Sequence, residues 1–160
     1  MNLFAKLAGL LVLAVMSMPP VAAATVTFEE LGEISGVVPI GNIGGIDFGW
    51  LGAFDTSLPD VQHLSTSPTN AAYLSPRIAY AIKSTDGNVF DFVGASFARS
   101  YAEGDYFQLI GRRDGEVIYS RTLEQVFVPR NSTPSFFDFN WEGIDTLSIS
   151  WTGFGQLCCS

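Results

Sequence analysis

Along the second half of this chain, apolar and polar residues alternate with a period of two, which is the period of a β-strand. Ile78, Tyr80 and Ile82 alternate with smaller or polar residues. The same alternation recurs at residues 106–112, 116–120, 137–141 and 147–151. Asp114-Gly115 separates two of these segments at a spacing that favours a tight hairpin turn. The pattern predicts an all-β fold, an antiparallel β-sandwich or jelly roll of about eight short strands.

The segment from residue 32 to residue 76 is rich in glycine, proline, serine and asparagine. Glycine permits positive φ and proline removes a backbone donor, so the segment predicts loops and very short strands. Residues 46–50 are its most strand-like part. Before this segment, a first strand is expected at residues 25–29, because they include β-branched and aromatic side chains.

Aromatic residues also mark the expected core. The 13 phenylalanines of the chain suit the space between two packed sheets. Trp141 and Trp151 lie in alternating strands, which favours a place in the core for both. Residues 89–93 and 96–101 are expected to form two separate strands, because Gly94 lies between them.

The first 24 residues have the pattern of a secretory signal peptide. Lys6 precedes an apolar run of roughly ten residues, which is too short for a helix that spans a bilayer and needs about 20. Small residues follow and end at Ala24. We therefore expect residues 1–24 to be removed and residues 25–160 to form a single β-sandwich domain. The expected location is outside the cell, or the periplasm if the cell is Gram-negative.

The chain carries 16 acidic and 8 basic residues, which gives a net charge of −8. Such a charge repels phosphate polymers and anionic lipid surfaces, so a nucleic-acid partner is not expected. No apolar segment after residue 24 reaches transmembrane length, so no membrane span is expected in the mature chain. Neutral glycans, cations and basic proteins remain as partner classes.

The two cysteines, Cys158 and Cys159, are adjacent in the sequence. A bond between them would close no long loop and therefore could not stabilise the fold. In an oxidising compartment they would form a strained vicinal disulfide, form an intermolecular bridge that links two copies into a dimer, or stay free. A metal role lacks partner ligands, because no second cluster of cysteine or histidine accompanies them.

Catalytic residues are not expected. His63 is the only histidine, and no Gly-x-Ser-x-Gly elbow presents a nucleophile, which argues against a serine-hydrolase triad. Zinc catalysis lacks ligands. Carboxylates able to hydrolyse glycosides are present by residue type, but the sequence places no two of them at the required separation. The composition therefore favours a protein that is not an enzyme.

Aromatic and polar residues of the irregular regions are the candidates for ligand binding. Trp50, Tyr73, Tyr101 and Trp151 are candidates for an apolar platform, because aromatic faces stack on the C–H groups of sugars. Asp47 and Asn70 lie near them in the sequence and would bind hydroxyl groups. Core packing is the competing interpretation for these aromatic side chains.

Short motifs run through most of the chain: residues 27–31, a glycine-rich segment ending in Trp50, residues 70–72, the hairpin at residues 111–119, and residues 139–147. Together they resemble a family of small secreted β-sandwich proteins found in fungi and in bacteria, often those with exosortase sorting tails. The resemblance implies a jelly roll similar to galactose-binding-like and carbohydrate-binding modules. It also implies a structural calcium ion, for which Glu29 or Glu30 would supply carboxylate oxygens.

The first functional hypothesis is therefore a secreted, non-enzymatic protein that binds carbohydrate or another extracellular ligand through its loops. The alternative is a structural or assembly component of an extracellular matrix or cell surface, in which the cysteines or exposed sheet edges link copies. No cofactor is expected apart from the calcium ion.

Overall fold

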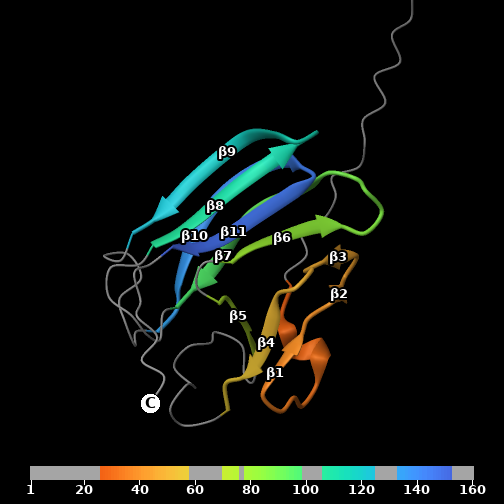
Figure 1. Ribbon diagram of the computed structural model, residues 1–160, viewed down its shortest axis with the longest axis vertical. Helices are drawn as coiled ribbons and strands as arrows, with labels where there is room; N and C mark the ends of the chain where they lie inside the picture. The colour runs from red at the N-terminus through yellow and green to blue at the C-terminus, as the bar shows by residue number, and fades with distance from the viewer. Residues whose placement is uncertain (1–25, 58–69, 76–77, 99–105, 125–132, 153–160) are drawn as a thin grey trace, which may run out of the picture.

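The computed structural model describes residues 26–57, 70–75, 78–98, 106–124 and 133–152 (Figure 1). These residues hold eleven β-strands, one short 3₁₀-helix and no α-helix, which confirms the all-β prediction. The elements are η1 (Phe28–Leu31), β1 (Val37–Pro39), β2 (Asn42–Ile43), β3 (Ile46–Asp47), β4 (Gly52–Asp55), β5 (Asn70–Tyr73), β6 (Ala79–Ser84), β7 (Phe90–Phe97), β8 (Tyr106–Arg113), β9 (Glu116–Leu123), β10 (Ser135–Ile144) and β11 (Thr146–Thr152).

Six strands form the largest sheet, in the order β2-β3-β6-β11-β8-β9, and all of its pairings are antiparallel. The alternation in the sequence is the reason for its two faces. In β6, Tyr80 and Ile82 are buried, whereas Ala79, Ala81 and Lys83 are exposed. One face of the sheet therefore packs on the core, and the opposite, outer face meets solvent.

The hairpin between β8 and β9 forms where the sequence predicts it. Asp114 has a φ of 52° and Gly115 a φ of 83°. Positive φ at both central residues is the requirement of a type I′ turn, whose twist matches that of the flanking strands. The expected turn therefore sets the register of the pairs next to it, Arg113 with Glu116 and Arg112 with Val117, and the pairing shifts by one residue between Arg112 and Gly111.

A second layer covers the inner face of this sheet. It contains the β7–β10 ribbon and, toward the β2–β3 end, the three-stranded sheet β1-β4-β5 (Figure 1). The ring of Phe97 in β7 lies 5.3 Å from that of Phe107 in β8, and the ring of Tyr119 in β9 stacks on Trp141 in β10 at 5.3 Å. These contacts make the antiparallel sandwich that the sequence predicts.

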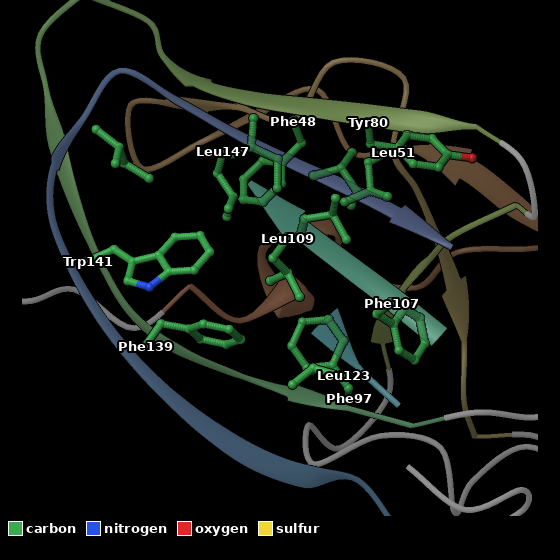
Figure 2. Packing of buried hydrophobic residues seen from close by; sticks show 14 of the residues in the cluster. Phe48, Leu51, Tyr80, Phe97, Phe107, Leu109, Leu123, Phe139, Trp141 and Leu147 are labelled. Atoms are coloured by element: carbon green, nitrogen blue, oxygen red, sulfur yellow. The ribbon is translucent and has the colours of Figure 1, made fainter. Parts of the chain in front are cut away.

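The core between the layers is rich in aromatic side chains. Figure 2 shows Leu109 of β8 at the centre of the cluster, with Phe139 and Trp141 of β10 on one side. Trp151 is half-buried and stacks on Phe107. The prediction that Trp141 and Trp151 belong to the core is therefore confirmed.

Two bulges bend β10 and keep its large side chains inside. The pairing with β7 shifts between Asp138 and Trp141 and again between Trp141 and Ile144. Asn140 and Gly143, which have φ values of 52° and 64°, lie within these shifts. Each extra residue turns the strand locally, so that Trp141 and Ile144 both face the core although they are three positions apart.

Two local predictions were wrong. Residues 28–31 form a 3₁₀-helix instead of continuing a first strand, because the Gly32 N–H closes a turn onto the Glu29 carbonyl at 2.9 Å. Gly94 does not end a strand, since β7 runs through it. An ideal Cβ built on Gly94 would lie 2.5 Å from the Phe136 ring, so the glycine makes room for that ring.

Candidate ligand-binding site

An open depression of about 640 Å³ lies on the outer side of β6, next to the point where β3 ends. Its lining includes Asp47, Trp50, Ile78, Ala79, Ala81 and Lys83. Four residues of β6 line it: Ala79, Ala81 and Lys83 face outward, and Tyr80 is buried. The small side chains of Ala79 and Ala81 therefore form the floor. Trp50, Ile78 and the oppositely charged Asp47 and Lys83 surround it.

Trp50 is held out into solvent by a turn that the core anchors on both sides. Phe48 and Leu51 are buried, and the Leu51 N–H donates to the Phe48 carbonyl at 3.1 Å across the turn. Gly49, the first central residue, has a φ of 57°, which is the position where a type II′ turn requires glycine. Trp50 is the second central residue, and 93% of its surface is exposed.

Gly49 has a second reason to be glycine. An ideal Cβ at this position would lie 3.1 Å from the Ala81 carbonyl oxygen of β6. The turn that carries Trp50 therefore rests directly against the backbone of β6. This close approach fixes the backbone of the turn relative to β6.

Asp47 and Lys83 place opposite charges at one end of the depression. They are directly paired between β3 and β6, so their side chains leave the same face of the sheet. The Gly49 N–H donates to Asp47 Oδ1 at 2.8 Å. The carboxylate therefore has a fixed orientation beside the turn that carries Trp50.

The edge of β6 adds backbone groups to the depression. The Thr85 N–H donates to the Gly45 carbonyl at 2.9 Å, so odd-numbered residues of β6 direct their backbone groups toward β3. However, β3 pairs only with Lys83 and Ser84. Among the described residues, the N–H and C=O of Ala79 therefore have no strand partner on that side and are available to a ligand.

The structure brings together two of the residues predicted for ligand binding, Trp50 and Asp47. Tyr73 lies in β5, outside the lining of the depression, with its ring edge-on to Phe54 at 6.2 Å. Asn70 is only 1% exposed. Tyr101 lies outside the described residues.

Asn70 serves the fold. Its side-chain Nδ2 donates to the Phe28 and Gly32 carbonyls at 3.0 Å each, and its backbone N–H donates to Glu29 Oε1 at 3.2 Å. These bonds tie η1 to β5. An asparagine near an irregular segment has the same appearance in the sequence whether it binds a ligand or holds a turn.

The surroundings of Glu29 bear on the calcium prediction. The amide group of Asn70 donates to the carbonyl oxygens of Phe28 in η1 and of Gly32 directly after it, which are ligands of the kind that calcium prefers. Glu29 accepts from Asn70, and Glu30 is exposed. The described residues contain no group of three or more acidic, histidine or cysteine side chains suited to a metal ion. The calcium ion stays a prediction.

Three carboxyl groups outside the depression have a lowered pKa, and hydrogen bonds are the cause. The backbone N–H of Ser57 lowers the pKa of Asp55, and the hydroxyl of Ser84 lowers that of Asp86. The backbone N–H of Asp114 holds the pKa of Asp145 below its usual range. All three lie at strand ends or turns, so these shifts reflect local backbone structure.

Sequence reasoning missed Ile78, Ala79, Ala81 and Lys83 as site residues. Their alternating pattern predicts a strand and nothing more. The available signal was the pair of alanines on the exposed face of an alternating segment, because small residues on a sheet surface leave room for a ligand. The position of Trp50 above them depends on the crossing from β3 to β4, which no local pattern shows.

Several predicted features lie outside the described residues: the signal peptide at residues 1–24, His63, and the cysteines Cys158 and Cys159. In the part of the chain that the structure describes, no helix has the length and apolar character to cross a membrane. Comparisons with protein-family models, curated proteins and solved structures found no match to this chain. The resemblance to the family of secreted β-sandwich proteins therefore stays a prediction.

Proposed function

We propose that this chain is a secreted, non-enzymatic protein that binds carbohydrate in the depression beside β6. The observation that carries the proposal is Trp50. Its indole contributes almost nothing to the core, because 93% of the residue is exposed. The backbone that carries it is nevertheless fixed, because buried residues anchor both sides of its turn. A tryptophan side chain has only two χ angles, so ordering it on binding costs little conformational entropy.

The remaining groups of the depression suit a sugar. Aromatic and aliphatic surfaces contact the C–H face of a pyranose ring, and Trp50 and Ile78 provide such surfaces. Hydroxyl groups need donors and acceptors, which Asp47, Lys83 and the backbone groups of Ala79 on the side that β3 does not pair provide. The small side chains of Ala79 and Ala81 let a ring approach the sheet closely.

The test is binding of the purified protein to a broad panel of glycans and insoluble polysaccharides, with calcium present. We expect selective binding, and we expect Trp50→Ala to remove it while the melting temperature stays unchanged. Phe136→Ala is the matched control, because Phe136 is also an exposed aromatic residue but lies on β10, outside the depression. Binding that survives Trp50→Ala, or folded protein that binds no glycan, would overturn the proposal.

A second candidate function, assembly of copies into an extracellular structure, is favoured by the exposed edge of the large sheet. Strand β9 is the last strand of this sheet and pairs only with β8 among the described residues. Val117 and Ile118 on this strand are exposed. An apolar strand with free backbone groups can pair with another copy.

Non-reducing electrophoresis and size-exclusion chromatography test the assembly function. If the cysteines link copies, a dimer band disappears in the Cys158→Ser/Cys159→Ser variant. If β9 links them, Ile118→Lys shifts the protein to the monomer position under reducing conditions. A protein that is monomeric in both measurements at high concentration would refute assembly by either route.

A further inference from the structure

We propose that the outer face of the six-stranded sheet extends the depression into a platform for a linear, neutral polysaccharide. This inference rests on the proposed carbohydrate-binding function. It adds the class of ligand, a polymer chain, and a second set of contacts beyond Trp50.

The register of the sheet sets outward-facing residues in rows that begin at the depression. Directly paired residues of antiparallel strands point to the same face. One row consists of Ala79, Ser150, Gln108 and Thr122, and the next of Ala81, Ser148, Ile110 and Ser120. The row between them, which begins with Tyr80, Ile149 and Leu109, is buried. The two hydroxyl-bearing rows are therefore the outer surface of the sheet, and we call them the platform.

The platform has the chemistry of a surface for sugar hydroxyls. Most of its side chains are alanine, serine or threonine, so the surface is flat and lets a polymer lie close to the strands. The hydroxyls of Ser148, Ser150 and Ser120 make no hydrogen bond to other described residues. They are free to donate to a ligand and to accept from it.

The platform is also longer than a single sugar ring. Neighbouring strands lie about 4.8 Å apart, so the three steps from β6 to β9 span about 14 Å. Trp50 stands at the β6 side. Tyr106 is paired with Thr152, two residues along β8 from Gln108, which places it on the same face, and it is partly exposed. Aromatic side chains therefore stand near two sides of the platform.

Charge points to a neutral polymer. Neither row contains a carboxylate, although the chain has 16 acidic residues and a net charge of −8. Exposed acidic side chains lie outside the two rows, at Asp91, Asp138 and Glu142 on the β7–β10 ribbon and at Asp47 in the depression, where Lys83 is its direct strand partner. A polyanion would be repelled by the protein as a whole, whereas a neutral chain meets neither repulsion nor unpaired charge on the platform.

The experiment measures affinity against chain length. Isothermal titration calorimetry uses neutral oligosaccharide series of glucans, xylans, mannans and galactans, from disaccharide to hexasaccharide, with polygalacturonate fragments as the anionic series. For at least one neutral series we expect the hexasaccharide to bind at least tenfold more tightly than the disaccharide. Polysaccharide pull-down with the same polymers gives a second readout that does not depend on heat.

Ser148→Glu tests the platform separately from the depression, because Ser148 lies in the middle of the second row. We expect that the affinity of this variant no longer increases with chain length and that its affinity for the disaccharide is unchanged. Ser96→Glu is the matched control, since Ser96 is an exposed strand residue on β7. It should bind every series as the wild type does.

The outcomes separate the two proposals. Two results would overturn the platform but not the carbohydrate site. One is affinity that depends on Trp50 but not on the number of sugar units, and the other is an increase in affinity with chain length that persists in Ser148→Glu. Tighter binding of the anionic series overturns the assignment of a neutral polymer. Folded protein that binds no member of any series overturns both the platform and the proposed function.

Discussion

Truncation of Asn70 to alanine should destabilise the protein strongly. The side chain is almost fully buried, and its Nδ2 donates two hydrogen bonds of 3.0 Å to the Phe28 and Gly32 carbonyls. These bonds join η1 to β5, which are about 40 residues apart in the chain. Asn70→Ala removes both donors and leaves both acceptors in place.

The magnitude follows from the two carbonyl groups that lose their partners. A buried polar group left without a hydrogen bond costs about 1–3 kcal/mol. Because these bonds are partly buried, water can reach the carbonyls in part, and we expect a total loss of about 2–4 kcal/mol in the free energy of unfolding. At about 3 °C per kcal/mol for a domain of this size, the melting temperature should fall by about 6–12 °C.

Urea unfolding followed by tryptophan fluorescence measures the loss, and differential scanning calorimetry measures the melting temperature. Asn42→Ala is the matched control, because Asn42 is an exposed residue in β2, and it should change stability by less than about 0.5 kcal/mol. A loss below about 1 kcal/mol for Asn70→Ala would show that the two hydrogen bonds do not hold η1 in place.

Three further changes test other parts of the fold. Gly111→Ala would place a Cβ 3.0 Å from Ile144 and Trp141, so we expect urea unfolding to show a loss of about 1–3 kcal/mol; unchanged stability would contradict the close packing of β8 on β10. Asp145 has a lowered pKa, first because of the Asp114 N–H, so its ionised form stabilises the fold at pH values above the unfolded pKa of about 4, and this contribution disappears as pH falls through the lower folded pKa. Thermal melts from neutral pH to pH 2 should therefore show the wild type losing stability relative to Asp145→Asn only in the acid range, and a constant difference would refute the assignment. Millimolar calcium should raise the melting temperature relative to chelator, and Glu29→Gln should abolish the rise, because a ligand that binds only the folded state stabilises it; equal melting temperatures with and without calcium would dismiss the calcium site.

The sequence predicts well those strands in which apolar and polar residues alternate in the same way as buried and exposed residues. In β6, the alternation of Tyr80 and Ile82 with small residues corresponds directly to one buried and one exposed face. The hairpin at Asp114-Gly115 is equally local, because its turn type depends on the two residues themselves. Such features need no knowledge of the rest of the chain.

The elements that the sequence does not predict are held by distant partners. Residues 25–28 have good strand propensity, but Asn70 holds the carbonyls of Phe28 and Gly32, and the ring of Phe28 packs on Phe48 at 5.6 Å. Strands β1 to β5 contain only two to four residues each, which is too few to show a period. Tertiary contacts override local propensity in both cases.

The sequence predicts only part of the candidate site, because the exposure of its residues also depends on tertiary contacts. Trp50 and Asp47 were chosen by residue type, and the same reasoning chose Asn70 and Tyr73, which lie elsewhere. What distinguishes Trp50 is the burial of its neighbours Phe48 and Leu51, which alternating patterns in a glycine-rich segment do not reveal. Exposure of an aromatic residue is a property of the whole fold, and no single segment encodes it.

The same crossing from β3 to β4 links the core to the site. The chain leaves the six-stranded sheet at Asp47 and enters the three-stranded sheet at Gly52. On the way it inserts Phe48 and Leu51 into the core, and the two residues between them are exposed. The packing of the sandwich therefore directs residue 50 outward. The fold determines where this side chain projects, whereas the identity of the residue, tryptophan, is not required by the core and can be explained by ligand binding.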